Sequence, residues 1–364
     1  MNEMSMLILF GVIFVPAVVI TAFTPYLVRK TESFGVSIPS EVFYSSELKA
    51  MRKQFATICL ALGLAVLAGF FLFFEAEEPM SALFIVGYVA AFFAVYVKFH
   101  FRMKALKREK AWHVAKKQAI AVDLKFHDKK PTYPNGWFAI GLLIWAATVI
   151  FTFLYYDQIP DRIPMQYDLE GNVTNWMEKS YGSVLALPLV TLILTGVFML
   201  VNSIIARSKQ QLDPSDPATS AKNNLIFRRR WSAYTIISGH ALIGLFSLMH
   251  LSFIFSEEPV WLMVALQIVA GGMIIGAVVL SVTTGQGGSR IRKTAPDHAE
   301  TINRDHDRYW ILGVFYFNPE DPALWVEKRF GIGWSMNFAR PLAWMILIGI
   351  LASVFLPMLL MRMK

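Results

Sequence analysis

Residues 182–206 read GSVLALPLVTLILTGVFMLVNSIIA and contain no Asp, Glu, Lys or Arg. About 20 apolar residues in a helix are enough to cross a hydrocarbon core of about 30 Å. A water-soluble helix of this length would instead carry a polar face. The stretch therefore predicts a membrane-spanning helix.

Seven further apolar stretches are uncharged, and every charged residue of the chain lies outside all eight. Of the 364 residues, 55% are hydrophobic and only 16% are charged, whereas ordinary soluble domains are about 25% charged. This composition excludes a disordered chain, a secreted disulfide scaffold and a typical cytosolic enzyme. We expect an all-α membrane bundle of about eight transmembrane helices. The other seven predicted spans are 5–28, 54–74, 81–97, 136–156, 232–256, 259–284 and 341–361.

Basic residues are concentrated in alternate connections between these spans. Four connections hold 30 of the 34 Lys and Arg residues, and they are 29–53, 98–135, 207–231 and 285–340. The positive-inside rule places such segments in the cytoplasm, which puts both termini outside the cell. This topology accounts for the net charge of +8 without nucleic-acid binding, and the basic face is also suited to anionic membrane lipid. The N-terminal MNEMSM has no basic region, so it favours a retained first helix over a signal peptide.

The spans and connections predict five regions along the chain. Two acidic turns, 77–79 and 257–259, stand about 180 residues apart and are consistent with a parallel repeat of two four-helix halves. The alternative is that any bundle with an even number of helices shows such flanks. The predicted regions are a first four-helix half, an extracellular loop module, helices five to seven, a cytoplasmic module and helix eight, at 1–156, 157–181, 182–284, 285–340 and 341–364.

The predicted outer loop 157–181 is patterned. Pro160 and Pro164 favour an extended entry because each fixes φ, and residues 168–172, DLEGN, predict a tight turn. Trp176 is expected at the lipid headgroups. If this loop contacts a ligand or partner, the candidate residues are Pro160, Pro164, Gln166, Asp168, Gly171 and Trp176.

On the predicted cytoplasmic side, several short segments are rich in β-forming residues. In Ile120–Phe126, apolar and polar side chains alternate with the period of a strand. We therefore expect a small β-rich layer under the membrane, and residues 98–118 as a basic helix that continues the third span. The expected strands are Phe34–Ile38, Ile120–Phe126, Ile311–Phe317 and Gly331–Phe338.

The chemistry-bearing residues favour a protein without catalytic activity, metal or cofactor. No Asp, Glu, Lys or Arg lies inside a span, which argues against an ion-coupled pump. The one cysteine, Cys59, allows neither an intramolecular disulfide nor a cysteine metal site. His250 and Gln267 are placed to hydrogen-bond across a helical hairpin, which favours a structural role. The glycine-rich 285–290 lacks the Gly-Lys-Ser/Thr of a phosphate-binding loop and is interpreted as a hinge.

Two segments resemble those of bacterial SdpI-type multi-pass membrane proteins. The first is Ile159–Pro164 with Gly171, Trp176 and Lys179, although Gln166 stands where the family has a histidine. The second has the pattern W-x-x-G-x-x-Y-x-N-P-x-D-P, from Trp310 to Pro322, followed by Arg329 and 331–340. The resemblance implies immunity to a peptide toxin and capture of a cytoplasmic regulator, but no mechanism.

Three hypotheses follow. The first is a non-enzymatic plasma-membrane protein with an SdpI-like immunity or signalling role, which binds a peptide outside and a regulatory protein inside. The second is a transporter or flippase for a lipid-like or apolar solute. The third is a structural subunit of a larger membrane complex, since Gly272 and Gly276 permit close helix approach. The candidate cytoplasmic partner surface comprises Tyr309, Trp310, Tyr316, Asn318, Pro319, Asp321, Pro322, Arg329, Trp334 and Asn337.

Overall fold

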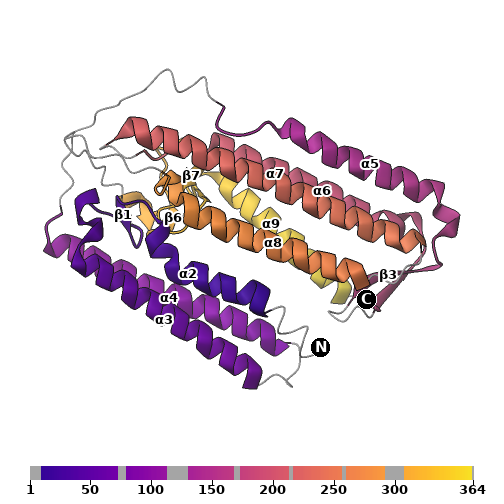
Figure 1. Ribbon diagram of the computed structural model, residues 1–364, viewed down its shortest axis with the longest axis horizontal. Helices are drawn as coiled ribbons and strands as arrows, with labels where there is room; N and C mark the ends of the chain where they lie inside the picture. Colours follow the sequence, from indigo (N-terminus) through magenta and orange to yellow (C-terminus); the bar gives the residue numbers. More distant parts are fainter. Residues whose placement is uncertain are drawn as a thin grey trace. The chain divides into compact units, whose positions relative to one another are not determined.

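A computed structural model describes most of the chain, and a helix is present in the described part of each of the eight predicted spans (Figure 1). The described residues are 10–72, 79–112, 130–167, 173–212, 216–255, 260–291 and 307–362. The α-helices within them are α2 (Val15–Leu27), α3 (Ser46–Leu72), α4 (Pro79–Glu109), α5 (Ala139–Leu154), α6 (Tyr181–Arg207), α7 (Pro217–Phe255), α8 (Val260–Thr284) and α9 (Pro341–Arg362).

Six helices of the described chain, α3 to α8, are long and apolar enough to cross a membrane, while α2 and α9 have shorter described apolar segments. Large apolar side chains on these helices are exposed, such as Leu143 at 70% and Ile268 at 68%. Apolar surface of this extent is unfavourable in water and favourable in lipid. The all-α membrane bundle is therefore confirmed.

Several helices are longer than the apolar stretches that predicted them. Helix α3 begins at Ser46, where the Ser45 hydroxyl caps the Leu48 amide at 3.4 Å. Helix α7 begins at Pro217, preceded by Asp216, whose carboxylate accepts the Thr219 amide at 3.0 Å. Aspartate at the cap followed by proline at the first helical position is a favoured helix start. A helix that continues beyond the lipid can carry charged side chains. The search for uncharged stretches therefore identified only the lipid-spanning part of each helix.

The chain forms two compact units. Unit 1 consists of residues 1–20, 128–206 and 228–280, and unit 2 of residues 21–127, 207–227 and 281–364. Helices α2, α7 and α8 are continuous and contribute residues to both. The predicted five-region division and the repeat stay predictions, since residues 73–78 and 256–259 with most of the acidic turns lie outside the described residues.

The predicted β-rich layer is present in unit 2 as short antiparallel pairs. Its strands pair Glu32 with Ser37, Trp310 with Tyr316, and Trp325 with Met336, and single bridges join Tyr316 to Asn337 and Lys209 to Val326. Residues 120–126, predicted as a strand, lie outside the described residues. The strands are β1 (Glu32–Ser33), β2 (Val36–Ser37), β5 (Trp310–Ile311), β6 (Phe315–Tyr316), β7 (Trp325–Glu327) and β8 (Trp334–Met336).

Two of these hairpins meet at their turns. The turn between β1 and β2 has positive φ at Phe34 (47°) and Gly35 (77°), and a Cβ on Gly35 would lie 2.7 Å from the Gly313 Cα. Only glycine permits this backbone approach. Phe34 is fully buried among Phe55, Phe99 and Phe330, so the turn anchors the core of unit 2 beside α3 and α4.

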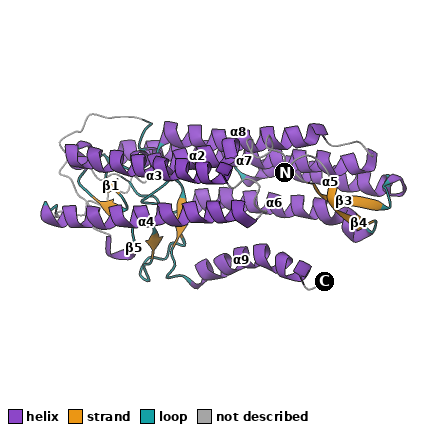
Figure 2. Ribbon diagram, turned by 90° about the horizontal axis from the view of Figure 1, so that it is seen from below, coloured by secondary structure: helices purple, strands orange, loops and turns teal. Residues whose placement is uncertain are grey.

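Unit 1 holds one further hairpin between α5 and α6. Strand β3 (Arg162–Tyr167) pairs antiparallel with β4 (Val173–Glu178), with a register irregularity at Gln166. Figure 2 shows this hairpin at the ends of α5 and α6. The predicted tight turn, residues 168–172, lies outside the described residues. The predicted extended entry is confirmed at Pro164, which lies within β3, while Pro160 precedes the strand.

Candidate functional site

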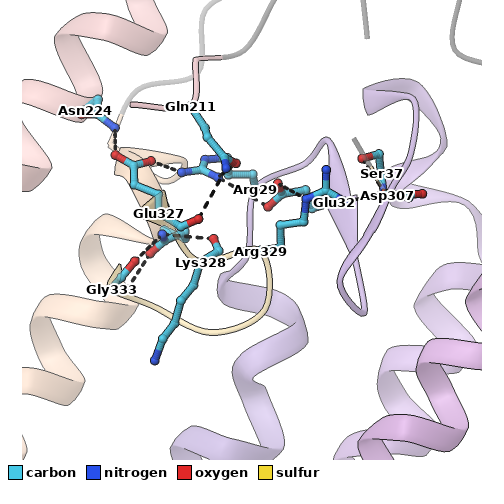
Figure 3. A network of polar contacts seen from close by, with 11 residues as sticks. Arg29, Glu32, Ser37, Gln211, Asn224, Asp307, Glu327, Lys328, Arg329 and Gly333 are labelled. Carbon is cyan, nitrogen blue, oxygen red and sulfur yellow. Dashed lines mark hydrogen bonds and ion pairs between the residues drawn. The ribbon is translucent and has the colours of Figure 1, made fainter. Parts of the chain in front are cut away.

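A network of buried ion pairs in unit 2 joins segments far apart in the sequence (Figure 3). Arg29, two residues after α2, is 8% exposed and forms an ion pair with Glu327 of β7, which is fully buried. The Arg29 guanidinium also lies 3.5 Å from the Glu32 carboxylate and donates to the Gln211 side chain at 2.8 Å. A buried charge is tolerated only when it is paired and hydrogen-bonded, and Arg29 meets both conditions.

The network continues through Asp307 at the start of the C-terminal segment. Asp307 forms ion pairs with Arg329 and with Lys107 of α4, the latter at 2.7 Å. The same carboxylate accepts the backbone amide of Ser37 at 3.1 Å and its hydroxyl at 3.0 Å. Arg329 also lies 3.8 Å from Glu32. These contacts fasten the C-terminal segment to β2 and to the end of α4.

Two amides extend the network to α7 and to the end of α8. Asn224, fully buried in α7, donates to the Glu327 carboxylate at 2.8 Å. Gln286, also fully buried, donates to the carbonyls of Lys328 and Gly333 at 3.2 and 2.9 Å and accepts the Gly333 amide at 2.8 Å. All four basic connections predicted to share one side of the membrane therefore contribute to one cluster.

The glycine-rich 285–290 was interpreted as a hinge, and the structure shows a close-packed turn instead. A Cβ on Gly288 would lie 2.3 Å from the Asn223 carbonyl oxygen, and φ at Gly288 is 83°. Glycine is needed at position 288 because the backbone of α7 occupies the space that a side chain would fill. The turn therefore holds the end of α8 against the start of α7.

The two acids facing Arg329 differ in their electrostatics. Burial raises the pKa of Glu32 above its usual range, although Arg29 and Arg329 act to lower it. Burial also acts to raise the pKa of Asp307, but Arg329 and Lys107 outweigh it and hold that pKa at about 2. Asp307 is thus firmly ionised at neutral pH, while Glu32 is easier to protonate than an ordinary glutamate.

A further acid, Asp321, accepts hydrogen bonds that hold the loop between β6 and β7. Its carboxylate accepts from Lys209 at 2.6 Å and from the Tyr316 hydroxyl at 2.8 Å. Its carbonyl accepts from Asn337 at 3.0 Å and from Arg340. The C-terminal segment 307–340 is therefore a module held together by its own hydrogen bonds.

An apolar cavity of about 210 Å³ lies in unit 1 beneath the β3–β4 hairpin. Ile159 and Ile163 enter it from the hairpin side and are almost fully buried together with Val184 of α6. Its lining residues are Ile159, Ile163, Pro164, Met165, Ser183, Val184, Ala186, Leu187, Val190, Met249 and His250.

His250 is the one ionisable side chain among these lining residues. Its Nε2 lies 2.7 Å from the Thr152 hydroxyl of α5, and His250 is 3% exposed. Sequence reasoning proposed Gln267 as its partner, whereas the structure gives it Thr152. The hydrogen bond links α5 to α7 at the cavity wall.

The predicted outer-loop residues spread along the hairpin. Pro160 is exposed before β3, Pro164 pairs with Trp176 in the register, and Trp176 is 53% exposed. Gln166 pairs with Asn175 at the irregularity. Asp168 and Gly171 lie outside the described residues.

The predicted partner-surface residues of the C-terminal module divide into two groups. Pro319 and Pro322 are exposed, and Tyr309 and Trp334 are half-buried, so these four remain candidates for partner contact. The other six are buried and hold the module together, and they are Trp310, Tyr316, Asn318, Asp321, Arg329 and Asn337.

Sequence reasoning missed the central residues of the network. The sequence does not single out Arg29, Glu32 or Glu327, and it places Gln286 only within the glycine-rich 285–290. The sequence gives only a weak indication that these acids are buried. Glu32 is an acid inside a basic connection, and Glu327 follows the apolar residues Trp325 and Val326. Neither position identifies its partner, because the partners are some 300 residues apart.

Two parts of the chain match the models of known protein families. Residues 143–192 match a domain of unknown function (DUF1648), and residues 319–344 match a family of unknown function (DUF5808). The first match contains the hairpin and most of the cavity lining, and the second contains Asp321, Glu327 and Arg329. No curated protein and no solved structure matches the chain. The chain thus carries two segments typical of uncharacterised families, and they overlap those that resemble SdpI-type proteins.

Proposed function

We propose that this chain is a non-catalytic protein of the bacterial plasma membrane that responds to an amphipathic peptide and reports to a cytoplasmic regulator, as in SdpI-like immunity. Peptide binding is assigned to the hairpin and cavity of unit 1, and reporting to the module 307–340 of unit 2. The resemblance to SdpI-type proteins supports this division, and the two family matches fall on the same two regions of the chain.

The observation that carries the proposal is the ion-pair network. Three helices contact the module through its two acids. Glu327 binds Arg29, which follows α2, and Asn224 of α7. Asp307 binds Lys107 of α4. A shift of any one of these helices separates a buried charge from its partner, which costs several kcal/mol. The module is thereby suited to two discrete states instead of gradual movement.

The cavity supplies the ligand chemistry. An apolar cavity of about 150 Å³ is enough to bind benzene, so a volume of about 210 Å³ accommodates one large apolar side chain. Met249 and His250 of the lining belong to α7, the continuous helix that also carries Asn224. An inserted side chain of a peptide would therefore act on a helix that belongs to the network.

The proposed orientation places the module and the basic connections in the cytoplasm and both termini outside, following the positive-inside rule. Its test is cysteine labelling in intact cells, in a Cys59→Ser background. We expect a membrane-impermeant maleimide to label Asn175→Cys of the hairpin and to leave Glu41→Cys unlabelled until the cells are lysed. Labelling in the reverse order would exclude the orientation.

The decisive experiment fills the cavity. Cells lacking the gene would be complemented with the wild type, with Ala186→Phe in the cavity lining, or with Leu189→Phe on the exposed face of α6, and challenged with amphipathic peptide toxins. We expect protection by the wild type and Leu189→Phe, and loss of protection with Ala186→Phe at equal membrane abundance. Equal survival of cells with and without the wild-type gene would overturn the immunity role.

A further inference from the structure

We propose that unit 2 contains a binding site for a phosphate-bearing anion, the headgroup of an anionic membrane lipid or a soluble phosphate, centred on Arg52. The site is separate from the ion-pair network and does not depend on the proposed function. It is a cavity of about 470 Å³ formed by the end of α2, the start of α3 and the turn after α8. Its lining residues are Tyr26, Val28, Lys30, Phe43, Tyr44, Lys49, Arg52, Lys53, Ser289 and Arg290.

Arg52 is a buried cation without a counter-charge. It is 2% exposed, and its Nη2 donates to the Phe43 carbonyl at 2.6 Å. Its Nε and Nη1 are buried and have no hydrogen-bond partner in the described structure. The two other buried guanidiniums discussed above, those of Arg29 and Arg329, are each paired with a carboxylate. Because an uncompensated buried charge is costly, the two free donors of Arg52 indicate an anion.

Aromatic rings fix the Arg52 guanidinium in place. It lies 4.2 Å from the Phe43 ring centroid and 5.7 Å from that of Tyr26. Cation–π contacts of this kind orient the planar group while leaving its N–H edge available. A guanidinium edge with two parallel donors matches the geometry of phosphate oxygens.

The surrounding side chains add positive charge and no negative charge. Lys49 and Lys53 of α3 both line the cavity with Arg52. Lys49 stands three residues before Arg52 and four before Lys53, the spacings at which helix side chains are neighbours. Lys30 and Arg290 join them from other segments. The Ser289 hydroxyl is a further buried donor without a partner among the described residues. Five cations without an acid in one lining create a strong local field for an anion.

The position favours a lipid headgroup over a small free ion. Tyr26 lies in the last turn of α2 and Arg52 in the second turn of α3, both at the ends of apolar helices. The volume exceeds that of a phosphate ion, and Tyr26, Val28 and Tyr44 supply an apolar wall next to the charges. This combination fits a phosphodiester with its glycerol.

The test uses the full-length protein purified in a zwitterionic detergent and stripped of lipid. Phosphatidylglycerol, phosphatidylcholine or inorganic phosphate would be added, and the melting temperature and the lipid retained in native mass spectrometry measured. We expect phosphatidylglycerol to raise the melting temperature and to remain bound, and phosphatidylcholine to do neither. Protection by inorganic phosphate equal to that by phosphatidylglycerol would assign the site to the soluble anion.

Two kinds of variant separate a built site from general attraction. Lys49→Gln/Lys53→Gln changes exposed side chains only and is expected to weaken phosphatidylglycerol binding at least tenfold. Arg52→Met removes the buried charge, so the lipid-free protein should melt no lower than the wild type while its response to phosphatidylglycerol is lost. The matched control, Lys104→Gln/Arg108→Gln on α4, removes the same charge outside the lining and should retain binding. Equal loss in the control, or undiminished binding of both anions in the two site variants, would overturn the proposal.

Discussion

The ion-pair network of unit 2 and the hairpin cavity of unit 1 hold their segments together by different means. In the network, charged side chains such as Arg29 and Glu327 join segments about 300 residues apart in the chain. In the hairpin region, a continuous stretch between α5 and α6 pairs its own backbone and buries a few aliphatic side chains. The first arrangement depends on directional contacts between charged groups, and the second on non-directional apolar contacts.

This difference separates two tasks. Apolar contacts around the hairpin cavity impose little orientation on the groups that meet there, because the hydrophobic effect is not directional. Buried ion pairs favour one arrangement, because a displaced charge loses part of the pairing that compensates for its burial. Four predictions test whether the two regions differ in this way.

The largest effect is expected from Glu327→Ala. The substitution leaves Arg29 buried without its partner and should lower the free energy of unfolding by about 3–5 kcal/mol. The measurement is thermal unfolding in detergent. The double variant Arg29→Met/Glu327→Leu should recover much of the loss, and purely additive effects of the two changes would contradict the coupling.

A smaller loss is expected from Gly288→Ala, at about 2–3 kcal/mol, since the new Cβ meets the Asn223 carbonyl at a left-handed φ. Gly244→Ala in α7 of unit 1 is the matched control, because a Cβ there has nothing within 4 Å. Alanine should be neutral or slightly stabilising at that helical site. The melting temperatures of the two variants compare the two regions directly. An equal change in melting temperature would contradict the proposed difference between them.

The two acids of the network should respond to pH in opposite directions. The lowered pKa of Asp307 contributes about 2 kcal/mol of stability above pH 4, which is lost as the pH falls toward 2. The raised pKa of Glu32 contributes stability at acidic pH, which is lost as the pH rises through that pKa.

Stability curves between pH 7 and pH 2 measure this contrast. Asp307→Asn should destabilise the protein at pH 7 and remove the acid-induced loss, while Glu32→Gln should be milder at pH 7. The opposite order of the two variants at neutral pH would contradict the assigned electrostatics.

The smallest effect is expected in unit 1. Thr152→Val keeps the shape of the side chain and removes the hydroxyl that lies 2.7 Å from His250, at a cost of about 1 kcal/mol. A shift in melting temperature as large as that of Glu327→Ala would show that unit 1 also depends on a single polar contact.

Much of the fold was predictable from local sequence. Each uncharged stretch became a helix, because lipid requires a backbone that satisfies its own hydrogen bonds. The β-rich segments 34–38, 311–317 and 331–338 contain or border observed strands. Helix starts at Ser46 and Pro217 were missed, since hydropathy does not detect helix that extends into water.

The candidate sites were predicted less well. The loop 157–181 was identified as a separate segment, but the cavity beneath it depends on side chains of α6 and α7. In the C-terminal module, residues such as Trp310 and Asn337 were expected on a partner surface, and they are buried. A patterned aromatic or amide does not reveal from sequence alone whether it packs inward.

The amino-acid sequence by itself determined the membrane class, the helical spans and the grouping of the basic connections, because the absence of charge over about 20 residues is a local property that lipid enforces. Only the tertiary structure decided that Arg29 pairs with Glu327, that His250 contacts Thr152 and that Arg52 lacks a counter-charge. Such pairings depend on which distant segments are brought within a few ångströms, and electrostatic contacts act over that distance regardless of separation along the chain.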